Sequence, residues 1–179
     1  YMPAGVWSET NRYGNLKNYK ADSGEGLYRR SMYTIWKRTA APPSMLLFDA
    51  PNREICMPKR SRTNTPLQAL ALMNEVTYVE AARALAQRMM KEGGDSVDSR
   101  LATGFRLVTA RTPDAHTLKV LKSGFERRRN QFEKDEERAK ALIAQGASKP
   151  DPSLPVPELA AYSATASILL NLDRVITKD

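Results

Sequence analysis

Beyond residue 64, apolar side chains recur every three or four positions, the spacing of amphipathic α-helices. The clearest helix start has Thr65 able to cap through its hydroxyl, Pro66 at the first helical position, and Gln68 able to reach back to the cap amide. Residues 67–73 are apolar on nearly all sides, so we expect this part of the helix to be buried. Asn74 can then interrupt or re-cap it.

The same pattern predicts three further helices. The first is amphipathic and ends at the glycine pair 93–94. The second begins near Ser96 and runs to Arg111. The third restarts at the Thr-Pro-Asp sequence 112–114 and continues through a highly charged stretch before Gly146, where charges three and four positions apart support one another.

An extended connector and one more helix are expected at the C-terminal end. Residues 149–157 hold four of the 11 prolines, a composition that excludes a helix. Residues 158–177 are rich in alanine and serine, and small side chains let helix axes approach closely, so this helix is expected in the middle of the bundle. Together these elements predict a mainly α fold, a helical bundle of about five helices.

The N-terminal third is less regular. Residues 1–26 show no sustained period and predict an irregular arm. The stretch 28–39 fits a helix or a strand; its tyrosine, threonine, isoleucine and tryptophan content favours the strand, so the fold has room for one short strand pair. We expect a single domain over residues 1–179, within a larger protein. Its parts are a basic arm and motif region (1–64), helices (65–145), a Pro-rich connector (146–157) and a C-terminal helix (158–177).

Charge and rare residues narrow the chemistry. The 179 residues carry a formal net charge of +8, of which +6 lies in residues 1–64, and this favours an anionic partner. Cys56 and His116 are the only cysteine and histidine, so we expect no intrachain disulfide, no zinc site, no other metal site and no Cys–His or Ser–His–Asp catalysis. No apolar run approaches the ~20 residues that cross a bilayer, so no membrane span is expected.

The sharpest site prediction is an anion pocket just before the predicted helix at Thr65. Helix N-terminal amides attract anions, and guanidinium groups match planar or tetrahedral oxyanions. The predicted anion-binding residues are Arg53, Lys59, Arg60, Arg62, Thr63, Asn64 and Thr65. The alternative is structural: the arginines pair with nearby carboxylates or carbonyls and hold an irregular segment in place.

Other polar residues have two interpretations each. Asp49 and Glu54 are weak catalytic candidates as an acid–base pair, and compensation of the neighbouring arginines is the competing role. Cys56 is expected to be a small buried hydrophobe, with a reactive thiol as the less favoured alternative, and His116 is expected to be an exposed polar position. Asn171 and Asp173 are expected to satisfy neighbouring backbone or arginine groups.

Four motifs connect the chain to a family. They are GEGLYRRSMYTIWKRT at 24–39, PSMLLFDAPNRE at 43–54, RTNTPLQAL at 62–70 and LLNLD at 169–173. With them the chain resembles a planctomycete-type C-terminal domain of unknown function, found in multidomain proteins with a c-type cytochrome domain. The resemblance implies an extracytoplasmic location, periplasmic or secreted. Proteins of this kind frequently occur together with sulfatases, so the resemblance also implies a link to the breakdown of sulfated polysaccharides. The haem motif Cys-x-x-Cys-His is absent from the sequence, so no cofactor is expected in this fragment.

We therefore expect a non-catalytic binding or scaffold module of a larger extracytoplasmic protein. Its expected partners are the other domains of the same polypeptide and an anionic glycan. A hydrolase or lyase acting on an acidic glycan through Asp49 or Glu54 is the alternative. Nucleic-acid binding is a second alternative and is disfavoured, because the sequence shows no long basic recognition helix and no zinc-finger, RNP-like or GXXG element.

Overall fold

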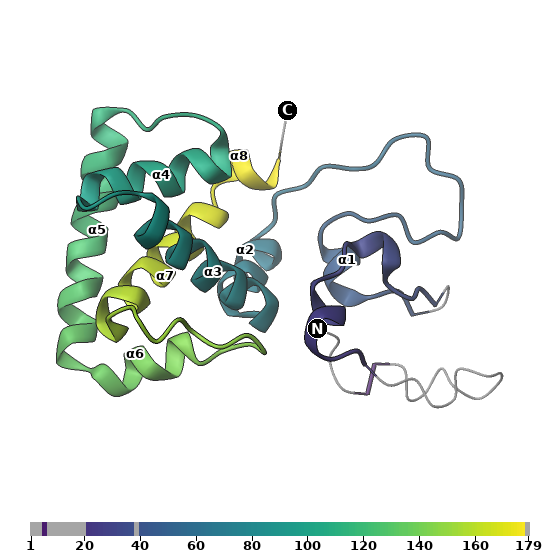
Figure 1. Cartoon of the computed structure of the whole chain (residues 1–179). Helices are drawn as coiled ribbons and strands as arrows, with labels where there is room; N and C mark the ends of the chain where they lie inside the picture. Colours follow the sequence, from purple (N-terminus) through teal and green to yellow (C-terminus); the bar gives the residue numbers. More distant parts are fainter. Residues whose placement is uncertain (1–4, 7–20, 38–39, 178–179) are drawn as a thin grey trace. The chain divides into compact units, whose positions relative to one another are not determined.

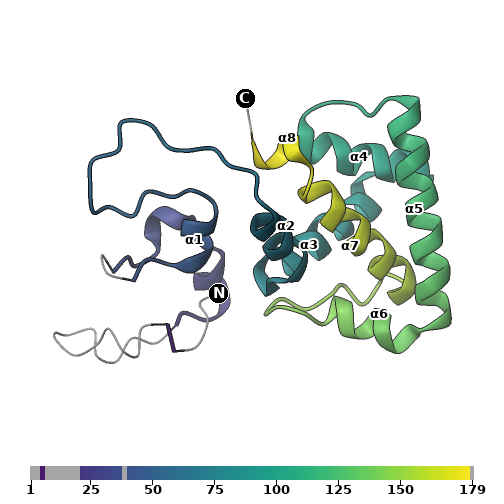
Figure 2. The same cartoon turned by 180° about the vertical axis from the view of Figure 1, so that it is seen from behind.

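The computed structural model describes residues 5–6, 21–37 and 40–177, and this part of the chain is mainly α-helical (Figures 1 and 2). It contains eight α-helices, six of them with eight or more residues, and no strand. The predicted mainly α fold is thus confirmed. The helices are α1 (Pro43–Leu47), α2 (Pro66–Asn74), α3 (Val76–Glu92), α4 (Val97–Thr109), α5 (Ala115–Lys134), α6 (Glu136–Ile143), α7 (Val156–Leu170) and α8 (Asp173–Ile176).

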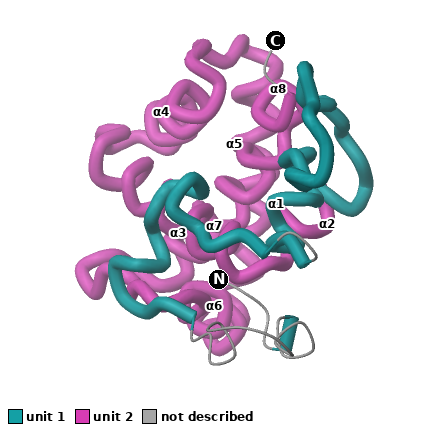
Figure 3. The backbone as a smooth tube through the Cα atoms, turned by 90° about the vertical axis from the view of Figure 1, so that its right-hand side faces the viewer, with its two compact units in different colours: residues 1–68 teal, residues 69–179 magenta. Residues whose placement is uncertain are grey.

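The chain divides into two compact units, residues 1–68 and 69–179, coloured teal and magenta in Figure 3. The boundary falls inside α2, close to the end of the basic region expected at residue 64. The first unit holds α1, and the second holds α3 to α8. Of the predicted irregular arm, residues 1–4 and 7–20 lie outside the described residues. The expectation of a single domain stays a prediction.

The strand favoured for the stretch 28–39 is wrong over its described residues. Two short 3₁₀ helices, Gly24–Tyr28 and Ser31–Tyr33, occupy this region, followed by one isolated bridge between Lys37 and Ala40. The physical reason is that strand-prone side chains form a strand only where a second strand supplies backbone partners. The described residues offer no such strand.

Local capping decides where α2 to α4 begin. The α2 start carries the predicted cap. An interruption follows as expected, but Glu75, and not Asn74, caps the next helix: the Glu75 carboxylate accepts a hydrogen bond from the Thr77 N–H at 3.1 Å. α3 then ends before Gly93, as predicted. Ser96 caps α4 through a 3.1 Å hydrogen bond from the Ser99 N–H.

Four helix boundaries differ from the sequence prediction. Asp114 caps α5, rather than the threonine two positions before it. Asp135 ends α5 and caps α6 by accepting the Arg138 N–H at 3.0 Å, so the charged stretch is two helices and not one. An aspartate competes for backbone amides in this way and favours helix ends. α7 begins at Val156, inside the expected connector, and ends at Leu170 before the separate α8.

The core of the second unit surrounds α7. Figures 1 and 2 show α7 running through the middle of the helices α3 to α6, and it packs against all four. Ala160, Ala161 and Ala166 are fully buried on it, and the Tyr162 ring lies 4.3 Å from the ring of Phe125 of α5. The prediction that small side chains bring this helix to the centre of the bundle is confirmed.

Candidate functional site

Asp49 is the centre of a hydrogen-bond network just after α1, in the first unit. Its Oδ2 accepts the Thr63 N–H at 2.8 Å, and the Thr63 hydroxyl lies 2.9 Å from both carboxylate oxygens. The Asp49 backbone is left-handed (φ 59°), a conformation that aspartate adopts more readily than most residues. The carboxylate therefore holds a threonine of the predicted anion site.

Arg60 binds the chain at the C-terminal end of α1. Its Nε donates to the carbonyl oxygen of Asp49 at 2.8 Å, and its Nη2 donates to the carbonyl oxygen of Phe48. The carbonyls of the C-cap residue and of the residue beyond it follow the end of α1, where no later helical N–H is available to bind them. The guanidinium supplies these donors, which is the structural role weighed against anion binding.

Gln68 connects α1 to the start of α2. The side chain is buried, and its Nε2 donates to the carbonyl oxygen of Leu47 at 2.8 Å and to Thr63 Oγ1 at 3.0 Å. Its Oε1 accepts the Thr65 N–H at 2.9 Å, while Thr65 Oγ1 accepts the Gln68 N–H at 3.3 Å. This reciprocal capping box is the one predicted from the sequence, and it uses these two amides internally.

Arg53 lies over the ring of Trp36 and is not among the groups bound to Asp49 and Gln68. Its guanidinium carbon lies 4.7 Å from the centre of the Trp36 ring, and the Trp36 Nε1 donates to the carbonyl oxygen of Asn52 at 3.3 Å. A guanidinium over an indole face gains a cation–π attraction. The pair fastens the turn after α1 to the segment before it.

The remaining basic residues surround an open hollow. Lys59, Arg60, Ser61 and Arg62 line a space of about 420 Å³, and residues 51–64 are all exposed. Arg62 and Asn64 each interact with another residue. The structure thus joins Arg60, Thr63 and Thr65 through Asp49 and Gln68. Anion binding by the predicted set stays a prediction.

The two weak catalytic candidates lie in different surroundings. The Asp49 carboxylate is occupied by Thr63, whereas Glu54 is exposed and its N–H donates to Asn52 Oδ1 at 3.1 Å in a local turn. Cys56 is exposed, so the expectation that it is buried is wrong. The reason is that residues 51–64 contribute nothing to the core, and even Ile55 beside it is 71% exposed.

His116 and Asn171 of the second unit behave as expected, whereas the Asp173 carboxylate binds a threonine side chain, which is neither backbone nor arginine. His116 is exposed near the start of α5. The Asn171 amide donates to the carbonyl oxygen of Ala69 at 3.4 Å, and the Asp173 carboxylate accepts the Thr177 hydroxyl at 3.3 Å.

A buried ion pair in the second unit escaped the sequence analysis. Arg83 and Glu80 of α3 are 2% and 4% exposed, and their side chains lie 3.4 Å apart. Arg83 also donates to the carbonyl oxygens of Gln145 at 2.6 Å and Ser148 at 2.7 Å, and Glu80 accepts the Ser148 N–H at 2.6 Å. The sequence signal that could have found it is the spacing of Arg83, which stands four positions after Val79 and three before Ala86 and so falls among the apolar positions of the helix. The network fastens the loop after α6 to α3.

Two kinds of site are missing from the described residues. Over 5–6, 21–37 and 40–177, no three histidine, cysteine, aspartate or glutamate side chains gather to hold a metal ion. Within the same ranges no helix combines the length and apolarity needed to span a membrane.

Comparison with protein families identifies the family of this chain. The family PSD1, described as a protein of unknown function (DUF1553), matches residues 5–125, which is more than half of the chain. The matched region contains the motifs at 24–39, 43–54 and 62–70; the motif at 169–173 lies beyond it. Among curated proteins and solved structures, none matches this chain. The chain therefore belongs to the DUF1553 family of proteins of unknown function.

Proposed function

We propose that this chain is a non-catalytic binding or scaffold module. The observation that carries the proposal is that the polar groups of residues 47–68 bind one another. Asp49 binds Thr63, Arg60 binds the carbonyls after α1, and Gln68 closes the cap of α2. A catalytic acid or base must instead reach a proton on the substrate. Pairwise satisfaction of these groups supports the scaffold role.

We further propose that the module is part of a larger extracytoplasmic, cytochrome-associated protein that works on sulfated or acidic polysaccharides. The support is the motif resemblance described above, together with the net charge of +8, which attracts polyanions. Its partners in this proposal are the other domains of the same polypeptide and an anionic glycan.

Affinity electrophoresis of the full chain tests the binding role. We expect dextran sulfate in the gel to retard the protein and neutral dextran to leave its mobility unchanged. After prolonged incubation, size-exclusion chromatography is expected to show dextran sulfate of unchanged length. Shortened dextran sulfate contradicts the non-catalytic proposal, and equal mobility in both gels contradicts the glycan partner. Retention on DNA that falls steeply with salt, without retardation by dextran sulfate, points to nucleic acid instead.

Two variants separate the scaffold role of Arg60 from its charge. Arg60→Ala removes the hydrogen bonds to the end of α1, so amide hydrogen exchange in residues 47–68 should accelerate. The matched control Arg30→Ala loses the same charge at an exposed position and should leave that exchange unchanged. Calorimetry with inorganic sulfate tests the predicted anion pocket: the number of sulfate ions bound per chain should fall in an Arg60→Ala/Arg62→Ala double variant, and an unchanged number contradicts the pocket.

A further inference from the structure

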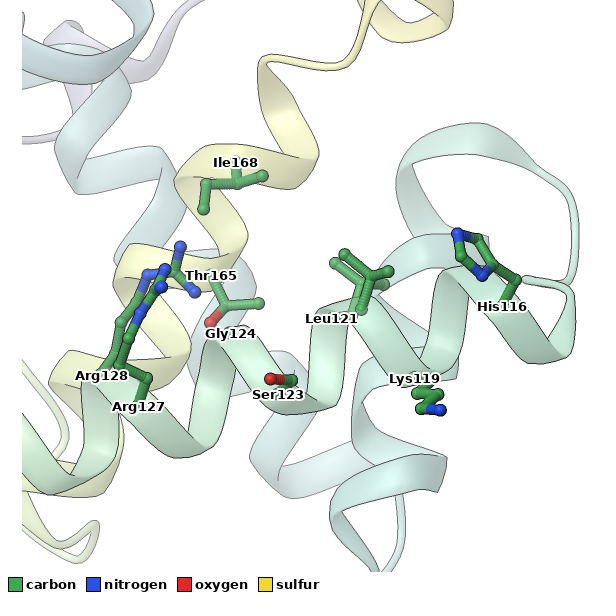
Figure 4. A pocket seen from close by; sticks show the side chains of 10 residues that line it. His116, Lys119, Leu121, Ser123, Gly124, Arg127, Arg128, Thr165 and Ile168 are labelled. Atoms are coloured by element: carbon green, nitrogen blue, oxygen red, sulfur yellow. The ribbon is translucent and has the colours of Figure 1, made fainter.

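A groove lies between α5 and α7, wholly within the second unit (Figure 4). Its volume is about 480 Å³, within the usual range of small-molecule sites. It shares no lining residue with the arginine-rich region of residues 47–68. The residues that line it are His116, Lys119, Val120, Leu121, Ser123, Gly124, Arg127, Arg128, Thr165 and Ile168.

One part of the groove is apolar and open to solvent. Val120 of α5 is 58% exposed and Ile168 of α7 is 38% exposed, and the half-buried Leu121 lines the same groove. Thr165 is fully buried, and its hydroxyl donates to the carbonyl oxygen of Ala161 at 2.8 Å. Because that hydroxyl proton is already used, the α7 side of the groove offers mainly hydrocarbon surface to a ligand.

Two neighbouring arginines form the other part. Arg127, Arg128 and Thr165 all line the groove, and Figure 4 shows the side chains of both arginines on the side of α5 that faces α7. Among the described residues no acidic side chain forms an ion pair with either arginine. By contrast, the next residue on the helix, Arg129, pairs with Glu133 at 2.8 Å. The groove therefore concentrates positive charge that its own surroundings do not compensate.

The position of Arg128 depends on a glycine one helical turn earlier. A Cβ atom at Gly124 would lie 2.8 Å from Arg128 Nη1, so the missing side chain makes room for the guanidinium against α5. Burial, and secondarily the charge of Arg127, lower the pKa of Arg128 below its usual value. Both effects disfavour the charged guanidinium, and an anion placed between the two arginines would relieve the repulsion.

We propose that the α5–α7 groove binds a small organic anion that joins an oxyanion group to an apolar body. The oxyanion, a carboxylate, sulfate or phosphate monoester, lies between Arg127 and Arg128, whose planar guanidinium groups match its geometry. The apolar body covers Leu121, Val120 and Ile168. This site goes beyond the proposed scaffold function, because it uses none of the residues that carry that proposal.

Isothermal calorimetry of the full chain tests the proposal with three probes: hexyl sulfate below its micellar concentration, inorganic sulfate and hexanol. We expect hexyl sulfate to bind at one site per chain, about tenfold or more tighter than either of the other probes, because only it offers both groups. Equal affinity for hexyl sulfate and inorganic sulfate overturns the proposal, since the apolar surface then contributes nothing.

Variants place the binding in the groove. Arg127→Gln and Arg128→Gln are each expected to weaken hexyl sulfate binding about tenfold. The matched control Arg129→Gln makes the same change of charge one residue further on, outside the groove lining, and should leave the affinity within about twofold. Ile168→Ala should weaken hexyl sulfate binding and leave inorganic sulfate binding unchanged. Thermal melting confirms that each variant is folded before titration.

Two results would overturn the assignment. The first is hexyl sulfate binding of undiminished affinity in an Arg127→Gln/Arg128→Gln double variant. The second is an equal loss in the Arg129→Gln control, because that result indicates a general attraction to a basic protein and no particular site.

Discussion

Gly104 and Gly124 are both inside helices, but a methyl group meets different atoms at the two positions. At Gly104 a Cβ atom would lie 2.6 Å from Sδ of Met89, which is fully buried, whereas at Gly124 it would meet only the mobile end of Arg128. Alanine favours a helix over glycine by about 1 kcal/mol, and overpacking a core costs about 1–3 kcal/mol. We therefore expect Gly124→Ala to raise the melting temperature and Gly104→Ala to lower it. Thermal melts in which both variants shift in the same direction contradict this.

Arg83 carries a buried charge that fastens the loop after α6 to α3. Replacing it with alanine removes its hydrogen bonds to the loop after α6 and leaves Glu80 buried without this partner. Breaking a buried pair costs about 3–5 kcal/mol, so Arg83→Ala should lower the free energy of unfolding by about that amount in urea titrations. The control Arg88→Ala removes an exposed ion pair with Glu92 on the same helix and should change the free energy of unfolding little. Equal effects of the two variants would show that burial is not the cause.

At the scale of elements, the Pro-rich connector is fastened to α3 by one aspartate. The Asp151 carboxylate pairs with Lys91 and accepts the Ser153 hydroxyl at 2.7 Å, while the Asp151 N–H donates to Gln87 Oε1 at 2.7 Å. The Lys91 ammonium first, and Ser153 second, hold the pKa of Asp151 well below its usual value. The charged form is thus favoured in the folded state more than in the unfolded one.

This lowered pKa gives a pH dependence of definite sign. The stabilisation from Asp151 is complete above the unfolded pKa of about 3.9 and is lost as the pH falls below it towards the folded pKa. The gap in melting temperature between the wild type and Asp151→Asn should be present at pH 7 and narrow between about pH 4 and pH 2. A gap of constant size over that range contradicts the assignment. Other aspartates of lowered pKa, such as the α5 cap Asp114, titrate equally in both proteins and cancel in the comparison.

Sequence reasoning succeeded where an interaction is local. The cap of Thr65 and Gln68 and the cap of Ser96 link residues three positions apart, so their side chains can be matched to amides in the printed sequence. It failed where the partner is distant. The strand favoured over 28–39 needs a second strand, and the contact between Arg83 and Ser148 spans 65 positions. The α5–α7 groove escaped for the same reason, because packing alone brings Ile168 to the helix of Arg128.

At the scale of the whole chain, the apolar core is concentrated in one unit. Every residue of the buried core cluster lies between Ala82 and Leu169. The first unit has α1, of only five residues, as its one complete α-helix within the described part of the chain, and isolated helices shorter than about 12–15 residues are marginal in water. The two units should therefore differ in whether they fold alone.

A fragment of residues 65–179 keeps the whole core cluster and the capping pair of Thr65 and Gln68, so it should be strongly helical by circular dichroism and unfold in one cooperative thermal transition. Residues 1–64 alone lose Gln68, which binds both the end of α1 and Thr63, and should show little helix and no cooperative transition. A broad, non-cooperative melt of the 65–179 fragment would mean that the core requires the first unit. A cooperative melt of 1–64 would mean that the network around Asp49 and Arg60 is stable without Gln68.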